Sequence, residues 1–202
     1  MKLYYSPGAC SLSPHIVVAE LGLPCELEKV DIRAVPHTTE SGKLFNEINP
    51  KGSVPALQLD NGELLTEGAA IVQYLADLSP NKQLAPANGT MARYRLQEWL
   101  NYIASEIHKG MGLLFMPNIP DDVRKMGVER LKQRLNYLSS TLTDRAYLMG
   151  EFSVADAYLF TCLNWHNYLQ LSLDAWPALL AYLKRVAERP AVQKVLKEEG
   201  LI

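Results

Sequence analysis

The strand-like segments of this chain are confined to its first 80 residues, and this asymmetry constrains the fold more than any other feature. Short apolar runs bounded by turn residues predict strands, and they lie at residues 3–5, 27–32, 56–59 and 63–65. Apolar residues at helical spacing predict helices, which start at Ser11 or Ser13, near residue 42 and at residue 67. The resulting order of elements is β-α-β-α-β-β-α.

This order restricts how the strands can pair. Two strands joined through a helix are expected to run parallel. The sequence Asp60-Asn61-Gly62 between the last two strands is typical of a hairpin turn, so those strands are expected to be antiparallel. A mixed sheet of this kind has the layout of a thioredoxin-like fold, which we predict for residues 1–80.

The remainder of the chain has a different pattern. Residues 81–88 are polar and contain proline, and we interpret them as a linker. Residues 89–202 contain no convincing strand, and their apolar side chains recur at helical spacing. We therefore predict an α+β, thioredoxin-like N-terminal domain followed by an all-α helical C-terminal domain at residues 89–202.

Composition excludes several classes of function. The formal net charge is −2 and no basic stripe is present, so nucleic-acid binding is not expected. No apolar run approaches the ~18 residues of a membrane span, and the N-terminus lacks the apolar core of a signal peptide. The three cysteines are widely spaced and the four histidines are scattered, which favours a reduced cytoplasm and predicts no metal.

Cys10 is the first candidate for chemistry, because it lies between a turn and the start of a helix. Free N–H groups at a helix start can stabilise a thiolate. A thiol with a pKa of about 8.5 is about 3% ionised at pH 7, whereas a pKa lowered to roughly 6.5 gives about three quarters thiolate. The alternative is an inert packed thiol, as we assume for Cys25 and Cys162. Ser13 occupies the second position of a CxxC spacing, so Cys10 could form a mixed disulfide without resolving it internally.

Two other groups of residues are candidates for binding. Glu67 and Gly68 lie at a helix start, where N–H groups favour anions. Taken alone, this position favours the alternative that Glu67 is only a first-turn charge facing the helix dipole. Asn101, Ser105 and His108 recur at i, i+4 and i+7, which predicts a polar stripe on one helix. That stripe is either a solvent face or the wall of a site. The neighbouring Lys109 either extends its charged end to solvent or adds a positive field.

Longer motifs resemble those of one family. "NPKGSVPAL", "LTEGAAIVQYL" and "FSVADAYLF", in this order over the whole chain, resemble the cytosolic glutathione transferases. "YYSPGACSLSPH" and "NYIASEIHKG" resemble the bacterial beta class, which has a cysteine near the N-terminus where other classes use tyrosine or serine.

The resemblance implies roles for individual residues. Pro55 would be a cis-proline that presents the Val54 backbone to the cysteinyl part of glutathione. Glu67 and Gly68 would hold the γ-glutamyl end, although many relatives have serine where Gly68 stands. The remaining implied contacts are Tyr5, Cys10, Asn101, Ser105 and His108, of which Cys10 and His108 would be catalytic. Ser153 and Asp156 would form a structural helix cap, and no residue is assigned to the glycyl end.

The resemblance also implies the function. We expect a cytoplasmic, homodimeric glutathione transferase that conjugates glutathione, its co-substrate, to hydrophobic electrophiles and transfers thiols through Cys10. The apolar half of the site is expected to involve residues 113–116. Alternatives on the same scaffold are a glutathione-dependent isomerase or dehalogenase and a non-catalytic protein that binds hydrophobic ligands.

Overall fold

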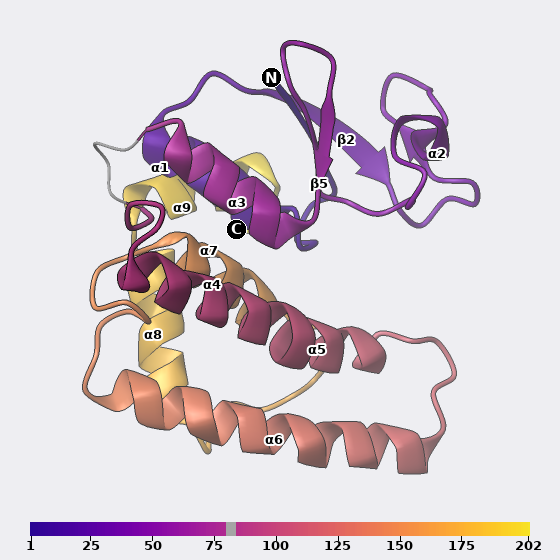
Figure 1. Cartoon of the computed structure of the whole chain (residues 1–202). Helices are drawn as coiled ribbons and strands as arrows, with labels where there is room; N and C mark the ends of the chain where they lie inside the picture. Colours follow the sequence, from indigo (N-terminus) through magenta and orange to yellow (C-terminus); the bar gives the residue numbers. More distant parts are fainter. Residues whose placement is uncertain (80–83) are drawn as a thin grey trace. The chain divides into compact units, whose positions relative to one another are not determined.

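The structure is a computed structural model that describes residues 1–79 and 84–202 (Figure 1). The chain divides into two compact units, one made of Met1–Gln83 with Arg189–Ile202 and the other of Leu84–Glu188. The first residues of the predicted linker at 81–88 lie outside the described residues. Within the described part of the chain, no helix is both long enough and apolar enough to cross a membrane.

The first unit contains the predicted mixed sheet. Its strands in the described residues are β1 (Lys2–Tyr5), β2 (Glu26–Asp31), β3 (Thr38–Thr39), β4 (Ala56–Gln58) and β5 (Leu64–Thr66), in the order β3-β2-β1-β4-β5. As predicted, β1 and β2 are parallel and β4 and β5 form an antiparallel hairpin. The two-residue strand β3, antiparallel to β2, is not predicted, because a pair of threonines carries no hydrophobic pattern.

Helices cover both faces of this sheet. Successive side chains of a strand point to opposite faces, and on β1 both Leu3 and Tyr4 are buried. The ring of Tyr4 lies 5.8 Å from the ring of Phe45 in the short helix α2 (Phe45–Ile48), which places α2 on the Tyr4 face. Helices α1 (Leu12–Leu21) and α3 (Gly68–Asp77) pack side by side against the other face (Figure 1).

The last helix, α9 (Pro190–Glu198), belongs to the first unit rather than to the helical one. It packs against α1, and the guanidinium of Arg189 donates to both carboxylate oxygens of Glu20 at 2.6 and 2.9 Å. The predicted boundaries, which grouped residues 89–202, therefore differ from the observed units at the C-terminal end. Helical periodicity identifies an apolar face but does not say which core covers it.

The residue after α9 forms a buried polar clamp on the start of the chain. The side chain of Glu199 is fully buried; Oε1 lies 2.8 Å from Nδ1 of His15 on α1, and Oε2 accepts from the Gly8 N–H at 2.8 Å. His15 is also buried, and its Nε2 lies 3.2 Å from a carboxylate oxygen of Glu198. The clamp thus ties the C-terminal segment to the turn that carries Cys10.

The second unit is helical throughout its described elements. It contains α4 (Met91–Tyr102), a π turn η2 (Ile103–His108), α5 (Lys109–Leu114), α6 (Asp121–Thr143), α7 (Val154–Asn164) and α8 (Pro177–Ala187). Helix α7 is buried along most of its length. The predicted cap is confirmed, because Ser153 and Asp156 form a reciprocal capping box at the start of α7. Burial raises the pKa of the Asp156 carboxyl, and donors from Leu148, Ser153 and Tyr182 oppose that rise.

The buried clamp predicts a large loss of stability in the variant Glu199→Ala. Removing the carboxylate takes away the acceptor of the Gly8 N–H and the hydrogen-bond partner of a buried His15 nitrogen, and losing a buried hydrogen-bonding group of this kind typically costs about 1–3 kcal/mol. Urea unfolding followed by circular dichroism measures the change. The matched control is Glu188→Ala, which removes an exposed pair with Lys184 at 3.9 Å and should cost less than about 0.5 kcal/mol. Equal losses in the two variants would show that the clamp contributes no stability.

Candidate functional site

Cys10 lies in the turn between β1 and α1, and the neighbouring serines hold that turn. The Ser11 hydroxyl accepts from the Ser6 N–H at 3.0 Å and donates to the Ser6 carbonyl at 3.2 Å. Ser11 occupies the N-cap position of α1, as predicted, but its side chain closes the turn instead of capping the helix. The Ser13 hydroxyl donates to the carbonyl of Cys10 at 2.9 Å. The position of the Cys10 sulfur is therefore determined by the turn and not by helix capping.

The thiol of Cys10 differs from the expected thiolate. The residue is partly buried, and its Sγ donates to the carbonyl of Val54 at 3.1 Å. Burial raises the pKa of the Cys10 thiol to about 11, although the N–H groups of Cys10 and Ser11 act in the opposite direction. The helix start thus lowers the pKa as predicted, but desolvation outweighs it. Cys10 is therefore a neutral hydrogen-bond donor at neutral pH.

The peptide bond between Val54 and Pro55 is cis, as the resemblance implied. Val54 is buried in the cluster that includes Tyr4 and Phe45. The Val54 carbonyl accepts from the Cys10 thiol, so the sulfur and the backbone of this cis X-Pro turn lie together in the first unit. This pairing of a thiol with an X-Pro backbone is the central geometric feature of the site.

Glu67 immediately precedes α3, and its backbone is strained. Its φ of 70° lies in a region that side-chain-bearing residues rarely adopt, which costs of the order of 1–3 kcal/mol. The carboxylate is exposed and lies 2.5 Å from the ammonium of Lys51, which also donates to the Thr66 hydroxyl at 3.0 Å. Residues with a strained backbone occur most often at functional sites. The strain therefore favours a binding role for Glu67 over that of a simple first-turn charge.

Gly68 and Tyr5 complete the predicted contacts of the first unit. A Cβ at Gly68 would meet the Pro55 ring at 3.7 Å, an ordinary contact, so the position has room for a side chain. Tyr5 ends β1, and its ring centroid lies 5.7 Å from that of His15. Burial raises the pKa of the Tyr5 phenol, so its hydroxyl is neutral at physiological pH.

A hollow of about 750 Å³ adjoins the turn that carries Cys10, and the sequence reasoning missed it. It is lined by Ser6, Pro7, Lys29, Val30, Asp31, Ile32, Arg33, Thr38, Thr39 and Glu40. The cations and carboxylates of this lining come from the end of β2, the loop after it and the residue that follows β3. The sequence did not predict β3, so it did not show that residues 38–40 lie beside β2 on the wall of this hollow.

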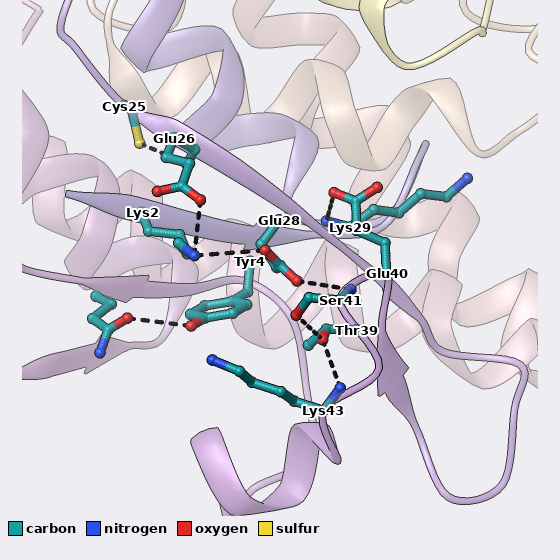
Figure 2. A network of polar contacts seen from close by, with 11 residues as sticks. Lys2, Tyr4, Cys25, Glu26, Glu28, Lys29, Thr39, Glu40, Ser41 and Lys43 are labelled. Atoms are coloured by element: carbon teal, nitrogen blue, oxygen red, sulfur yellow. Dashed lines mark hydrogen bonds and ion pairs between the residues drawn. The ribbon is translucent and has the colours of Figure 1, made fainter.

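A network of polar contacts braces one wall of this hollow (Figure 2). The Ser41 N–H donates to the carboxylate of Glu28 at 3.2 Å, and the Lys29 N–H donates to Glu40 at 3.1 Å. The hydroxyl of Thr39 lies 3.0 Å from that of Ser41. The hydrogen bond from the Ser41 side chain is the main cause of the lowered pKa of Glu28. The network fixes the turn that follows β3 against β2.

In the second unit, Asn101, Ser105 and His108 do not form a single stripe. Asn101 and Ser105 are exposed, and the Ser105 hydroxyl donates to the Asn101 carbonyl at 2.9 Å. His108 instead turns toward α7, where its Nδ1 lies 2.6 Å from the hydroxyl of Tyr158. The predicted i, i+4, i+7 spacing assumed an α-helix, whereas η2 is a π turn, which holds more residues per turn. Such turns frequently occur at functional sites.

The environment of His108 keeps its imidazole neutral. Burial is the larger cause of its lowered pKa, and the charge of Lys109 lowers that pKa further. The predicted influence of Lys109 is therefore present. Of the residues expected in the apolar half of the site, Leu114 is buried, whereas Phe115 and Met116 are exposed. The ring of Phe115 lies 5.7 Å from that of Trp165, which also contacts His108.

The described residues contain no group of three histidine, cysteine or acidic side chains placed to hold a metal ion. The first unit offers a neutral thiol, an exposed carboxylate and a turn backbone, and the second unit offers a neutral imidazole.

The raised pKa of Cys10 predicts the pH dependence of its alkylation. In the ligand-free protein, the reaction with iodoacetamide should accelerate about tenfold per pH unit from pH 7 to 9.5, because only the thiolate reacts and its population keeps rising toward a pKa of about 11. Peptide mapping separates Cys10 from Cys25 and Cys162. A rate that levels off below pH 8 would contradict the neutral thiol.

Comparison with known proteins places both units in one family. Residues 8–78 match the family model of the glutathione S-transferase N-terminal domain, and residues 102–190 match that of the C-terminal domain. The chain is 46% identical over 202 residues, the whole of both chains, to glutathione S-transferase GstA of Escherichia coli O157:H7.

Two solved structures are similar to the whole chain. A sphingomonad glutathione S-transferase complexed with glutathione is 46% identical with a TM-score of 0.95, covering all of both chains. The bacterial beta-class glutathione S-transferase of Sphingomonas chungbukensis is 44% identical, also with a TM-score of 0.95 and full coverage of both. With its cis Val54–Pro55 bond beside the Cys10 thiol, the chain therefore belongs to the glutathione S-transferase family, within the bacterial beta class.

Proposed function

We propose that this transferase binds glutathione along the Val54–Pro55 backbone and conjugates its sulfur to hydrophobic electrophiles. The single observation that carries the proposal is the contact between the Cys10 thiol and the Val54 carbonyl. A cis X-Pro turn offers main-chain groups to an extended peptide, and the thiol beside it is placed to meet the sulfur of that peptide. Membership of the transferase family supports this assignment.

The γ-glutamyl end of glutathione carries an ammonium and a carboxylate, and the start of α3 suits both. The N–H groups of a helix start favour a carboxylate. The carboxylate of Glu67 is paired with the ammonium of Lys51, so it already holds the kind of group that the ligand would supply. This contact supports Glu67 as the partner of the ligand's amino group. Gly68 adds only its backbone N–H, because it has no hydroxyl.

Cys10 has two roles in this proposal. In conjugation, the neutral thiol turns its single S–H from the Val54 carbonyl to the glutathione thiolate, and a thiol with a pKa of about 11 keeps that hydrogen throughout the physiological range. In thiol transfer, a transient Cys10 thiolate attacks oxidised glutathione, forms a mixed disulfide and releases one glutathione thiolate. An outside thiol must then attack the mixed disulfide, because Ser13 cannot.

The second unit is proposed to contribute the remaining groups. His108, Asn101 and Ser105 would close the site near the sulfur, and the exposed Phe115 and Met116 would contact the electrophile. The alternatives on the same scaffold gain no specific support: the relative named maleylacetoacetate isomerase is only 26% identical, against 46% for the E. coli transferase. A non-catalytic binding protein would not need the strained Glu67 or the positioned Cys10.

We further propose a cytoplasmic homodimer. The described cysteines are free, which suits a reducing compartment. The second unit exposes large apolar side chains, including Met91 on α4 and Met126 on α6, at 70% and 72% of their surface. Exposed apolar groups of this size commonly mark interfaces.

The homodimer predicts twice the mass of one chain in solution. Sedimentation velocity at micromolar concentration measures that mass, and a single monomer boundary would reject the dimer.

The variant Glu67→Ala should weaken glutathione binding by about 10-fold or more, because a charge-assisted hydrogen bond to the ligand ammonium is lost. Isothermal titration calorimetry measures the dissociation constant, and circular dichroism checks the fold. Gly68→Ser is the matched variant at the next position, which has room for a side chain; its added hydroxyl should strengthen binding. An unchanged dissociation constant in Glu67→Ala would remove Glu67 from the site.

Incubation with oxidised glutathione should add one glutathione to the protein, and the adduct should be removed by a reductant. Intact-mass measurement detects the adduct, and peptide mapping should place it on Cys10. Cys10→Ala should abolish it, whereas the control Cys25→Ala should retain it. Persistence of the same adduct in Cys10→Ala would show that Cys10 takes no part in thiol transfer.

A further inference from the structure

Two residues of its own unit, Tyr158 and Trp165, hold the ring of His108. Its Nδ1 lies 2.6 Å from the Tyr158 hydroxyl, and its ring meets the ring of Tyr158 edge-on, with a centroid distance of 5.7 Å. The ring of Trp165 lies 5.0 Å away. Tyr158 and Trp165 are both buried, with only 4% and 6% of their surface exposed. The orientation of the imidazole is thus set by one hydrogen bond and two aromatic contacts.

The hydrogen bond also bears on where the imidazole proton sits. A neutral imidazole has one N–H and one bare nitrogen, and the group bonded to one nitrogen decides the state of the other. A phenol is a much stronger acid than a neutral imidazole N–H, so in a short contact between them the phenol is the preferred donor. Tyr158 then donates to Nδ1, and the ring proton lies on Nε2.

We propose that Tyr158 is a positioning residue that holds His108 as the Nε2–H tautomer and so makes it a hydrogen-bond donor in the reaction. This inference rests on the proposed function, in which His108 lies near the glutathione sulfur. The assignment excludes a role for neutral His108 as a general base through Nε2, because that nitrogen has no free lone pair. His108 instead donates to the sulfur anion or to charge that develops on the electrophile.

As the Nε2–H tautomer, His108 has the same kind of role as Cys10. Each is a neutral donor whose charged form is disfavoured chiefly by burial. Two neutral donors stabilise a sulfur anion without neutralising it by proton transfer. The sulfur therefore stays anionic and nucleophilic, which conjugation requires.

The first test measures the tautomer and needs no activity. Long-range proton–nitrogen correlation spectra of the ¹⁵N-histidine-labelled, full-length protein distinguish a protonated from a bare ring nitrogen. The proposal expects a protonated Nε2 and a bare, hydrogen-bonded Nδ1 for His108, with the signals assigned by their loss in His108→Ala. In Tyr158→Phe the Nδ1 resonance should move toward that of a bare nitrogen without a donor. A bare Nε2 in the native protein would overturn the proposal.

The matched control is Tyr182→Phe. Tyr182 is also buried, and its hydroxyl donates to the Asp156 carbonyl of α7 at 3.1 Å. This variant should lose stability through the same loss of a buried hydroxyl while leaving the His108 nitrogen signals unchanged. An equal shift of those signals in both variants would mean that Tyr158 acts only through general packing.

The second test measures turnover with a hydrophobic electrophile at saturating glutathione. Tyr158→Phe should lower kcat on the order of 10-fold with KM for glutathione unchanged, since it misplaces a group that acts in the transition state. In a His108→Ala background, Tyr158→Phe should cause no further loss, because the two residues act as one unit. Additive losses would overturn the positioning role. If His108→Ala alone leaves turnover unchanged, the proposed role of His108 fails, and the tautomer result is unaffected.

Discussion

The buried carboxylate of Glu199 connects the parts of the first unit on which the site depends. It accepts from the Gly8 N–H in the turn before Cys10 and bonds to His15 on α1. A carboxylate without such partners would be expensive to bury, so the three groups hold one another in place. The turn, the helix and the C-terminal segment therefore form one structural unit, and the position of the Cys10 sulfur depends on all three.

Burial decides the chemistry of the two candidate catalytic side chains more than their nearest polar neighbours do. At Cys10 the N–H groups of a helix start favour the thiolate, yet desolvation raises the pKa to about 11. At His108 desolvation lowers the pKa and favours the neutral ring. Opposite directions of shift thus have the same result, a neutral donor, because in each case the charged form is the one that burial penalises.

Local patterns in the sequence predicted those features that depend on near neighbours along the chain. The hairpin at Asp60-Asn61-Gly62 and the capping box of Asp156 are of this kind, and both are present. Features that depend on distant residues were not predictable in this way. The thiol of Cys10 is desolvated by residues brought together by folding, and α9 packs on α1, which lies near the other end of the chain. The π turn at residues 103–108 has no apolar signature distinct from that of an α-helix, so His108 was assigned to a stripe that it leaves.

The clamp on the Cys10 turn also has a consequence for the order of events during synthesis. The Gly8 contact of Glu199 spans 191 residues, so Glu199 is synthesised long after Gly8. The strands of the first unit can pair earlier, but the N–H of Gly8 meets the Glu199 carboxylate only after the entire helical unit has been made. Contacts that distant slow folding because a long loop must close first. A nascent or truncated chain that stops before residue 199 would therefore have the sheet and the cysteine but would lack the contact that fixes the turn between them.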